Sequence, residues 1–399
     1  MRILYHHRTR SRDGQRVHIE GLVGALRRAG HDIEIVEPRP RVEAPAAARG
    51  AAPPSSGPAS SAPVKGDGGP PRASLLRELA ELAYNVPERW QLLRAARRFR
   101  PDAIYSRHAL FASSALAAAR ALRLPLLIEV NAPLALERSR HGGLRLESYA
   151  RRLETRVLNG ADRVIVVTRA MAQLMEQQGV AAERLEVHWN GLEPEALARP
   201  LDGAAQRRAR GWSDALVLGF VGFVRDWNRL ERVFPFLRNE PRARLVVVGE
   251  GPDRARLERL AGEAGVAAQL EFLGTLPRAQ VLDVVAAFDV ALLPEVTEYA
   301  SPLKLLDYFA AGRAALLPDR ANLREVIRDG ENGVLFDPRD DADFGRKLAA
   351  LVADPAARAR LGAAGRATLA ERGLTWDANA ARVVAEFEAA RARRAGAGR

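Results

Sequence analysis

Residues 298–312 combine a short helix pattern with polar side chains that suit a phosphate-bearing ligand. Ser301 is a good N-cap, because its hydroxyl can accept a hydrogen bond from a free backbone N–H group at the start of a helix. Pro302 stands where the first helical residue tolerates proline, and Gly312 stands where a helix commonly ends. These residues predict a short helix between Ser301 and Gly312.

The start of this predicted helix could bind the phosphates of a nucleoside diphosphate. Its first N–H groups, that of Leu303 among them, carry the positive end of the helix dipole. Lys304 adds a full positive charge, and Asp307, three residues further on the same face, can accept hydrogen bonds from ribose hydroxyls. The alternative is an ordinary capped helix with a solvated pair of Lys304 and Asp307.

The fold that must position these residues is predicted by short apolar runs that alternate with helical patterns. Such alternation is typical of parallel sheets covered by helices. The pattern weakens between Leu192 and Ser213, where we place a linker. We expect strands at 3–5, 33–36, 103–105, 126–130 and 163–168 in a first series, and at 217–221, 245–248, 270–273, 290–293, 315–317 and 334–336 in a second.

We therefore expect an α/β protein of two doubly wound, Rossmann-like domains that face a cleft. The first spans residues 1–200, the second 211–372, and a helix with a basic tail follows over 373–399. Residues 41–73 are rich in Ala, Pro, Gly and Ser and lack periodicity, so we expect a disordered insertion within the first domain.

In the first domain, Gly14 precedes the first helix, where the lack of a side chain would let the backbone approach the phosphates of a bound ligand or would only ease a turn. His18 lies one turn into that helix, and it either faces the cleft as a catalytic residue or is exposed or capped. Four more residues could contact a ligand in the cleft: His6, His7, Arg8 and His141.

The composition excludes several classes of chemistry. The 399 residues include no cysteine, so disulfides, thiolate metal sites and a cysteine nucleophile are excluded. No apolar run approaches the length of a membrane span, and the first residues do not form a signal-peptide core. No cluster with metal-ligand spacing is present. We expect a cytoplasmic protein without a metal.

The net charge of +12 admits three explanations. Only three of the 61 basic residues are lysines, and arginine is spread over the whole chain, which is typical of a solvated, compositionally biased surface. Attraction to an anionic membrane leaflet is the second explanation, and it would place the protein peripherally on the inner face of the plasma membrane. Nucleic-acid binding is the third, and no recognition motif or aromatic-basic interleaving supports it.

The segment around Lys304 resembles the donor-site motif of the family-4 retaining glycosyltransferases, which have the GT-B fold. In that family one glutamate meets the donor sugar, and a second, eight positions later, holds the ribose. Asp307 stands at the second position; Tyr299 stands eight residues earlier, and Glu298 matches only with a shift of one residue. Further similar segments are 161–168, 189–191, 248–252, 272–274 and 324–333.

The chain departs from the family pattern at two places. After the first strand of the second domain the family has Arg and Lys for the diphosphate, whereas this chain has Arg225 and, in place of the lysine, Asn228. Arg225 could bind the diphosphate or be a solvated loop arginine. Where the family often has a histidine beside the reacting sugar, this chain has Asn131, which cannot carry a proton at neutral pH but can donate a hydrogen bond.

The resemblance implies transfer of a sugar from a nucleotide-diphosphate donor, a UDP-sugar foremost, to a glycan, lipid-linked or small-molecule acceptor, as in polysaccharide biosynthesis. The configuration at the anomeric carbon would be retained, with the leaving diphosphate itself taking the acceptor's proton. It implies no cofactor and no metal, because the helix dipole, Arg225 and Lys304 would offset the diphosphate charge. Two alternatives remain: a GT-B sugar-nucleotide epimerase, and an inactive protein that binds nucleotide sugars as a scaffold.

Overall fold

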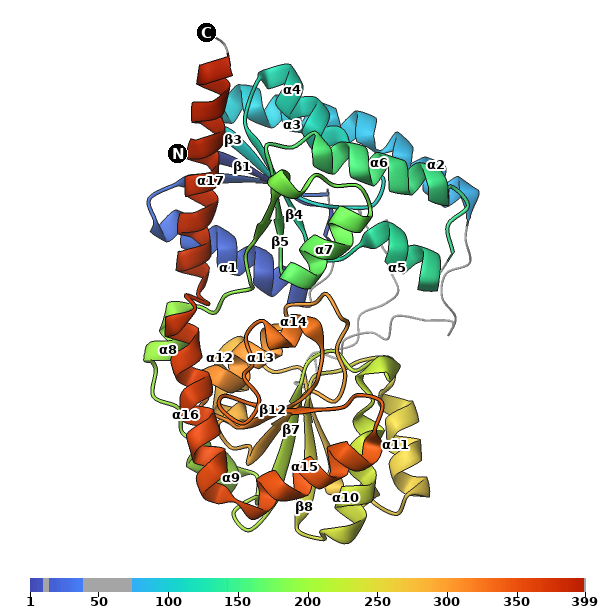
Figure 1. Cartoon of the computed structure of the whole chain (residues 1–399), viewed down its shortest axis with the longest axis vertical. Coiled ribbons are helices and arrows are strands. Elements are labelled where there is room, and N and C mark those ends of the chain that lie inside the picture. Colours follow the sequence, from blue (N-terminus) through green and yellow to red (C-terminus); the bar gives the residue numbers. More distant parts are fainter. Residues whose placement is uncertain (10–13, 39–73, 142, 398–399) are drawn as a thin grey trace, which may run out of the picture.

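The computed structural model describes residues 1–9, 14–38, 74–141 and 143–397. It consists of two domains, each built on a parallel six-stranded sheet with helices on both faces (Figure 1). The predicted α/β fold of two doubly wound domains is thereby confirmed. The predicted disordered insertion at 41–73 lies outside the described residues. Within the described ranges, no helix is long and apolar enough to cross a membrane.

The sheet of the N-terminal domain has the strand order β2-β1-β3-β4-β5-β6. Its strands are β1 (Arg2–His6), β2 (Asp32–Val36), β3 (Ala103–Arg107), β4 (Leu126–Val130), β5 (Arg163–Val166) and β6 (Leu185–Val187). The helices around it are α1 (Gly14–Arg28), α2 (Leu75–Ala83), α3 (Asn85–Phe99), α4 (Ser114–Leu122), α5 (Leu134–His141), α6 (Glu147–Asn159) and α7 (Arg169–Gln177).

The sheet of the C-terminal domain has the order β12-β11-β10-β7-β8-β9. Its strands are β7 (Leu216–Val221), β8 (Ala243–Val248), β9 (Leu270–Gly274), β10 (Val290–Leu292), β11 (Ala315–Pro318) and β12 (Val334–Phe336). The α-helices that follow β6 are α8 (Pro194–Ala198), α9 (Gly203–Ala209), α10 (Phe234–Asn239), α11 (Arg254–Glu263), α12 (Arg278–Val285), α13 (Leu303–Ala310), α14 (Ala321–Arg324), α15 (Asp341–Ala353), α16 (Pro355–Glu371) and α17 (Trp376–Ala397).

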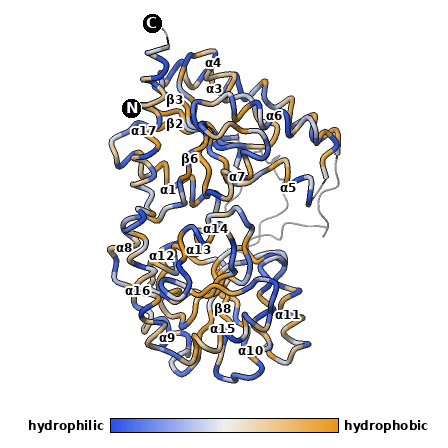
Figure 2. Tube along the Cα trace, in the orientation of Figure 1, coloured by the Kyte–Doolittle hydropathy of each residue, from blue (hydrophilic) through white to orange (hydrophobic). Residues whose placement is uncertain are grey.

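Most strands are buried on both faces, which explains their continuous apolar sequences, whereas the edge strands β2, β6 and β9 are only partly buried. In β8, for example, Leu245, Val246 and Val247 are fully buried, with alternate residues in the two layers that flank the sheet. Hydrophobic residues accordingly gather along the central strands in Figure 2. The sequence therefore specifies the buried strands through apolar runs, whereas the edge strand β2 alternates polar and apolar residues.

The last helix returns to the N-terminal domain. After α16 the chain pairs with the interdomain connection, through a parallel bridge between Leu192 and Thr375, and α17 then packs along α1 (Figure 1). Trp376, Val383 and Phe387 belong to the same apolar cluster as the residues of β1 and α1. The N-terminal domain is thus built from two distant stretches of the chain.

Candidate active site

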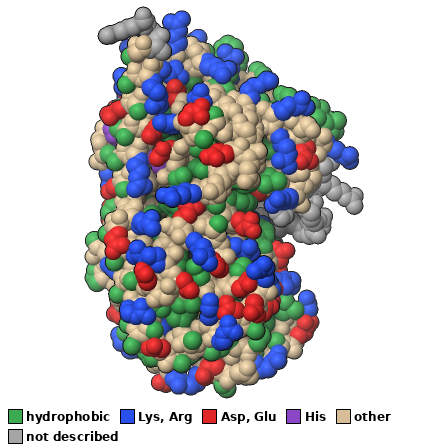
Figure 3. All heavy atoms as spheres, viewed as in Figure 1, with side chains coloured by type: hydrophobic (Ala, Val, Ile, Leu, Met, Phe, Trp, Pro, Cys, Tyr) green, Lys and Arg blue, Asp and Glu red, His purple; other side chains and the backbone are tan. Residues whose placement is uncertain are grey.

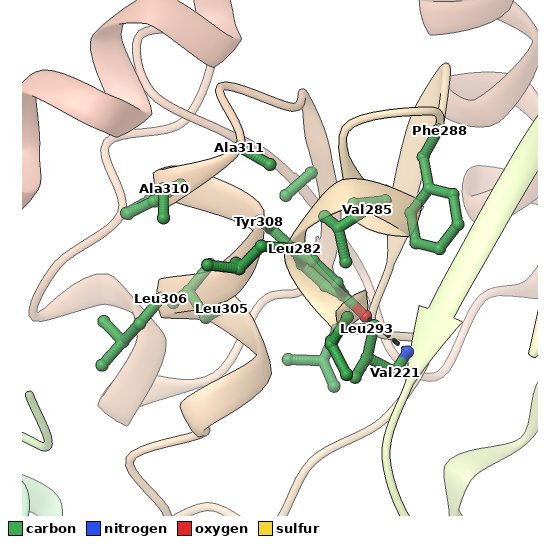
Figure 4. Close-up of a cluster of buried hydrophobic side chains, with 14 of the residues drawn as sticks. Val221, Leu282, Val285, Phe288, Leu293, Leu305, Leu306, Tyr308, Ala310 and Ala311 are labelled. Atoms are coloured by element: carbon green, nitrogen blue, oxygen red, sulfur yellow. Dashed lines mark hydrogen bonds between the residues drawn. The ribbon is translucent and has the colours of Figure 1, made fainter. Parts of the chain in front are cut away.

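The strand order of the second sheet reverses between β7 and β10, and ligands of doubly wound sheets bind outside the strand ends at such a point. Tyr308, which is fully buried on α13, forms hydrogen bonds with both of these strands. Its hydroxyl accepts a hydrogen bond from the Val221 backbone N–H at 3.1 Å and donates to the Leu292 carbonyl at 2.9 Å (Figure 4). Helix α13 is therefore fixed relative to the ends of both strands.

Two glycines form the floor beside this point. Gly222 follows β7 with φ +133°, and a Cβ atom there would lie 2.9 Å from the Lys304 Nζ atom. Gly249 follows β8 with φ +142°, and a Cβ atom there would meet the Gly222 carbonyl oxygen at 2.1 Å. Only glycine permits this approach of the two loops and of Lys304 to the backbone.

Lys304 has no hydrogen bond or ion pair with any described residue. Its Nζ atom lies 3.9 Å from the centre of the Phe220 ring, a cation–π contact. Burial lowers the pKa of Lys304 to about 7, and the nearby Asp307 carboxylate only partly opposes the shift. An anion bound at this place would supply the missing counter-charge.

The helix α13 begins differently from the prediction. Ser301 is not its N-cap: the Ser301 hydroxyl accepts a hydrogen bond from the Asn190 backbone N–H at 3.0 Å, and Pro302 takes the cap position without a side-chain bond to the helix. The reason is tertiary, since Asn190 lies in the connection between the domains. Leu303 is the first helical residue, and the first N–H groups of α13 have no side-chain cap. The other end is as expected, because Gly312, with φ +63°, terminates the helix.

Asp307 is buried and forms an ion pair with Arg278, the first residue of α12, at 2.5 Å. Burial would lower the pKa of Arg278, but the Asp307 carboxylate raises it above its ordinary value. Glu193 lies 3.7 Å from the same guanidinium group. Arg278 could not be predicted as a site residue, because nothing in the segment after β9 connects it with a residue 29 positions away.

Arg225 lies between two half-exposed aromatic rings, with its guanidinium carbon 4.8 Å from the Phe223 ring centre and 4.7 Å from that of Trp227. It has no ion pair among the described residues. Asn228, at the position expected for a lysine, is buried, and its Oδ1 atom accepts a hydrogen bond from the Arg225 backbone N–H at 2.8 Å. Asn228 therefore shapes the loop that presents Arg225.

In the loop before α13, the neighbouring side chains of Glu298 and Tyr299 have different surroundings. The Glu298 side chain is 77% exposed and lies 3.3 Å from Arg320. Tyr299 points into the N-terminal domain, where its hydroxyl donates to Glu137 and its carbonyl accepts from the Thr168 hydroxyl at 2.8 Å. The position eight residues before Asp307 is thus part of the contact between the domains.

On the facing edge of the N-terminal sheet, Asn131 follows β4, and its Nδ2 atom donates to Glu129. The buried Glu129 carboxylate also accepts from His18 at 2.9 Å, Tyr105 at 2.6 Å and Arg107 at 2.8 Å. Burial alone would raise the pKa of Glu129, but His18 and Arg107 hold it well below its ordinary value.

The prediction that His18 could be exposed or capped is wrong. His18 is buried between Glu129 and Trp376, and the centres of the His18 and Trp376 rings are 4.7 Å apart. It supports Glu129 and, through it, Asn131. Gly14 is the first residue of α1 rather than part of the preceding loop. Side-chain contacts of His141 lie outside the described part of the structure.

A second buried carboxylate organises the end of β1. Glu88 pairs with Arg8 at 2.5 Å and with the His6 Nε2 atom at 3.1 Å. Burial would raise the pKa of Glu88, but the hydrogen bonds from His6 and Arg8 hold it at about 2. His7 is buried, and burial together with the neighbouring His6 lowers its pKa to about 4. Two of the residues predicted to contact a ligand, His6 and Arg8, are therefore paired with Glu88.

Comparison with known proteins identifies the family. The model of Glycosyltransferase Family 4 matches residues 12–196, and that of Glycosyl transferases group 1 matches residues 205–368. The chain belongs to the family-4, group 1 glycosyltransferases.

Individual relatives of this chain match over part of their length. The D-inositol 3-phosphate glycosyltransferase of Thermomonospora curvata is 32% identical over 259 residues, which is 60% of this chain and 59% of that one. A glycogen synthase of Mycobacterium tuberculosis is 27% identical over 286 residues, 70% of this chain and 66% of that one. The chain thus spans about three fifths of the first of these relatives.

Solved structures share the glycosyltransferase fold over nearly the whole chain. HepE of Anabaena in complex with UDP superposes with a TM-score of 0.73 at 16% identity, covering 98% of this chain and 100% of that one. WaaG, a glycosyltransferase involved in lipopolysaccharide biosynthesis, gives a TM-score of 0.67 at 15% identity, covering 96% and 98%. Both agree with the GT-B architecture of two facing domains.

The two domains of the chain are held together by hydrogen bonds beside the site. The Glu325 carboxylate accepts from the backbone N–H groups of Arg169 and Ala170, at the start of α7, and from the Trp189 indole at 2.9 Å. Asn190 donates from its side chain to the Ser301 carbonyl at 2.6 Å. The sequence contained Glu325 in a recognisable segment, but its partners lie more than 130 residues away.

Proposed function

We propose that this glycosyltransferase transfers a sugar from a nucleotide-diphosphate donor, held by the C-terminal domain, to an acceptor that enters against the N-terminal domain. The observation that carries the proposal is the unpaired Lys304 ammonium beside Gly222, at the uncapped start of α13. Free N–H groups, the helix dipole and a lysine without a counter-ion together suit a diphosphate.

We assign the binding of the ribose hydroxyls to the Asp307 carboxylate, which lies about one turn after Lys304 on α13. Arg278 holds this carboxylate at 2.5 Å through one oxygen, Oδ1, which keeps it in a fixed position for ribose hydroxyls. A UDP-sugar is the donor we place first, because HepE, which shares the fold, has been solved with UDP and with UDP-glucose. The D-inositol 3-phosphate glycosyltransferases and the glycogen synthase among its relatives leave the acceptor open between small molecules and glycans.

For the chemical step we propose transfer with retention of the anomeric configuration. The acceptor hydroxyl attacks the anomeric carbon as the bond to the diphosphate oxygen breaks, and its proton passes to that departing oxygen on the same face of the sugar. Lys304, Arg225 and the start of α13 would stabilise the charge on the diphosphate, the task that a metal performs in other transferases. Asn131, oriented by Glu129, would contribute a hydrogen bond and Glu298 a contact to the donor sugar.

A donor screen tests this proposal. UDP, GDP, ADP and dTDP are added separately, and the melting temperature is measured, because a ligand that binds only the folded protein raises it. We expect one diphosphate, UDP first, to give the largest shift. The corresponding nucleotide sugar is then supplied with candidate acceptors, and proton NMR of the first product establishes its anomeric configuration.

The alternatives predict different outcomes of the same screen. A sugar-nucleotide epimerase would release free nucleotide without any acceptor. An inactive scaffold would bind the diphosphate tightly and show neither hydrolysis nor transfer. The absence of a shift with all four nucleotides would contradict the proposed donor site.

We further propose that the N-terminal domain meets its acceptor at an anionic membrane surface. The outer faces of α2 and α3 expose large apolar side chains, with Leu76 at 81% and Trp90 at 66% exposure. Val86, Trp90 and Arg94 follow one another at four-residue intervals along α3, so apolar and basic side chains share one stripe. Elsewhere, Figure 3 shows basic and acidic side chains interspersed over both domains.

Sedimentation with vesicles tests the membrane surface. Binding to vesicles that contain phosphatidylserine, but not to neutral ones, and its loss at high salt are the expected results. The double variant Leu76→Ser with Trp90→Ser should bind less, whereas Trp227→Ser, which removes a half-exposed ring in the other domain, should bind as before. No binding of the unaltered protein at low salt would contradict the proposal.

A further inference from the structure

A second polar pocket lies in the C-terminal domain at the opposite end of α13 from Lys304. It has a volume of about 490 Å³, within the range of small-molecule sites. All of its polar side chains are arginines, and no carboxylate of the described residues lines it. The lining residues are Arg199, Pro200, Leu201, Gly203, Ala204, Arg207, Ala286, Ala311, Arg313 and Arg366.

Two of the four arginines have carboxylate partners behind the pocket wall. Arg199 lies 3.0 Å from Asp283, and Arg207 forms an ion pair with Asp289. Neither aspartate lines the pocket. The charges of these two arginines are therefore largely compensated.

The other two arginines have only backbone carbonyl partners within the described structure. Arg313 donates to the carbonyls of Ala311 at 3.0 Å and Phe288 at 3.3 Å. Arg366 donates to the carbonyl of Leu197 at 2.6 Å and to that of Ala310. Burial lowers the pKa of Arg313, and the neighbouring charge of Arg207 lowers it further, while Asp289 opposes the shift. The pocket thus holds two positive charges without a counter-ion.

The walls of the pocket come from elements that are packed closely. Gly203 begins α9 directly against α12, since a Cβ atom there would lie 2.2 Å from the Ala286 carbonyl oxygen. Arg313 follows the end of α13, and Arg366 extends from α16, which packs along α13. The pocket is therefore lined by α9 and α16 and by the segments that directly follow α8, α12 and α13.

We propose that this pocket binds a phosphorylated sugar, at a site separate from the donor site. The guanidinium groups of Arg313 and Arg366 offer paired N–H donors that match phosphate oxygens. The carbonyl groups that these arginines now contact would accept hydrogen bonds from sugar hydroxyls once the guanidinium groups turn to the phosphate. The eight residues of α13 separate the pocket from Lys304 by about 12 Å, so one ligand need not displace the other.

Calorimetry with glucose 6-phosphate and with inorganic phosphate as probes tests the inference on the whole chain, with and without saturating UDP. We expect glucose 6-phosphate to bind at least tenfold more tightly than inorganic phosphate, and equally well when UDP is present. The double variant Arg313→Gln with Arg366→Gln should lose at least tenfold in this affinity and keep its affinity for UDP.

Two further variants make the result decisive. Arg313→Gln, made separately, should show the same loss if the double variant does not fold. Arg259→Gln removes an exposed arginine of α11 that pairs with Glu263, and it should change nothing. The inference is overturned if neither probe binds at millimolar concentration, if UDP displaces the probe, if the pocket variants bind like the unaltered protein, or if both probes bind equally. Because UDP binding is measured in parallel, failure here is distinguishable from failure of the donor site.

Discussion

The facing edges of the two sheets differ in how completely their polar groups are paired. On the N-terminal edge, Glu129 accepts from four side chains, and Glu88 is surrounded by Arg8, His6 and Ser114. On the C-terminal edge, Lys304 has no polar partner among the described residues, and Arg225 contacts only aromatic rings. Both edges occupy the same position in a doubly wound fold.

This difference indicates how binding energy is distributed between the domains. Paired groups on the N-terminal edge stabilise the fold and fix the orientation of Asn131. Unpaired donors on the C-terminal edge leave a favourable interaction to be formed only when an anion arrives. Substitutions that alter one edge at a time should separate these two roles.

The largest effect is expected for Glu129→Gln. The substitution leaves Arg107 buried without its counter-charge and weakens the hydrogen bond from His18, and breaking a buried ion pair typically costs about 3 kcal/mol or more in the free energy of unfolding. Urea denaturation followed by tryptophan fluorescence measures the loss. The control is Glu37→Gln, since the Glu37 side chain is 52% exposed and 3.6 Å from its partner His7. If the two variants have the same free energy of unfolding, the buried hydrogen bonds of Glu129 do not stabilise the fold more than an exposed pair does.

Lys304→Ala tests the opposite edge, and it should reduce turnover by about 100-fold or more, because the charge it removes gains value as the diphosphate departs. UDP affinity should fall as well, while the free energy of unfolding is kept or rises, since a desolvated ammonium is removed. Lys347→Ala is the matched control: Lys347 lies on α15, 3.4 Å from Asp343. Unchanged turnover in Lys304→Ala would place the diphosphate elsewhere.

Asp307→Asn should weaken ribonucleotide binding roughly ten- to hundredfold, because hydrogen bonds to a charged group contribute about 1.5–3 kcal/mol. It also leaves Arg278 without its partner, so some stability will be lost. The informative quantity is the ratio of affinities for UDP and its 2′,3′-dideoxy analogue, which a general loss of stability does not change. If both ligands lose the same affinity, Asp307 is structural only.

The smallest effect concerns pH. Lys304, with a pKa of about 7, is charged below pH 7 and neutral above it, and a bound diphosphate raises this pKa. Binding must therefore take up a proton above pH 7, and UDP affinity should fall by up to about tenfold between pH 7 and 8. Lys304→Arg keeps its charge throughout and should flatten the profile measured by calorimetry. A flat profile for the unaltered protein would contradict the assigned pKa.

The fold could be predicted from the sequence because apolar runs and turn residues are local signals. All eleven strands expected from the pattern are present, and the strand at Leu185–Val187 completes the first sheet. The individual contacts could not be predicted in the same way. His18 meets Glu129 across 111 residues, and Ser301 meets Asn190 across the same separation. Such pairs depend on how distant elements pack against one another, and the periodicity of apolar residues gives no information on that packing.

The path of α17 has a consequence for how the protein is made. Trp376, Val383 and Phe387 complete the apolar core beside β1 and α1, yet they are synthesised some 350 residues later. The C-terminal domain has its whole sheet and α16 once residue 371 has left the ribosome, so it can fold first. The apolar face beside β1 and α1 is covered only when α17 has been synthesised. The half of the molecule that is synthesised first therefore completes its core last.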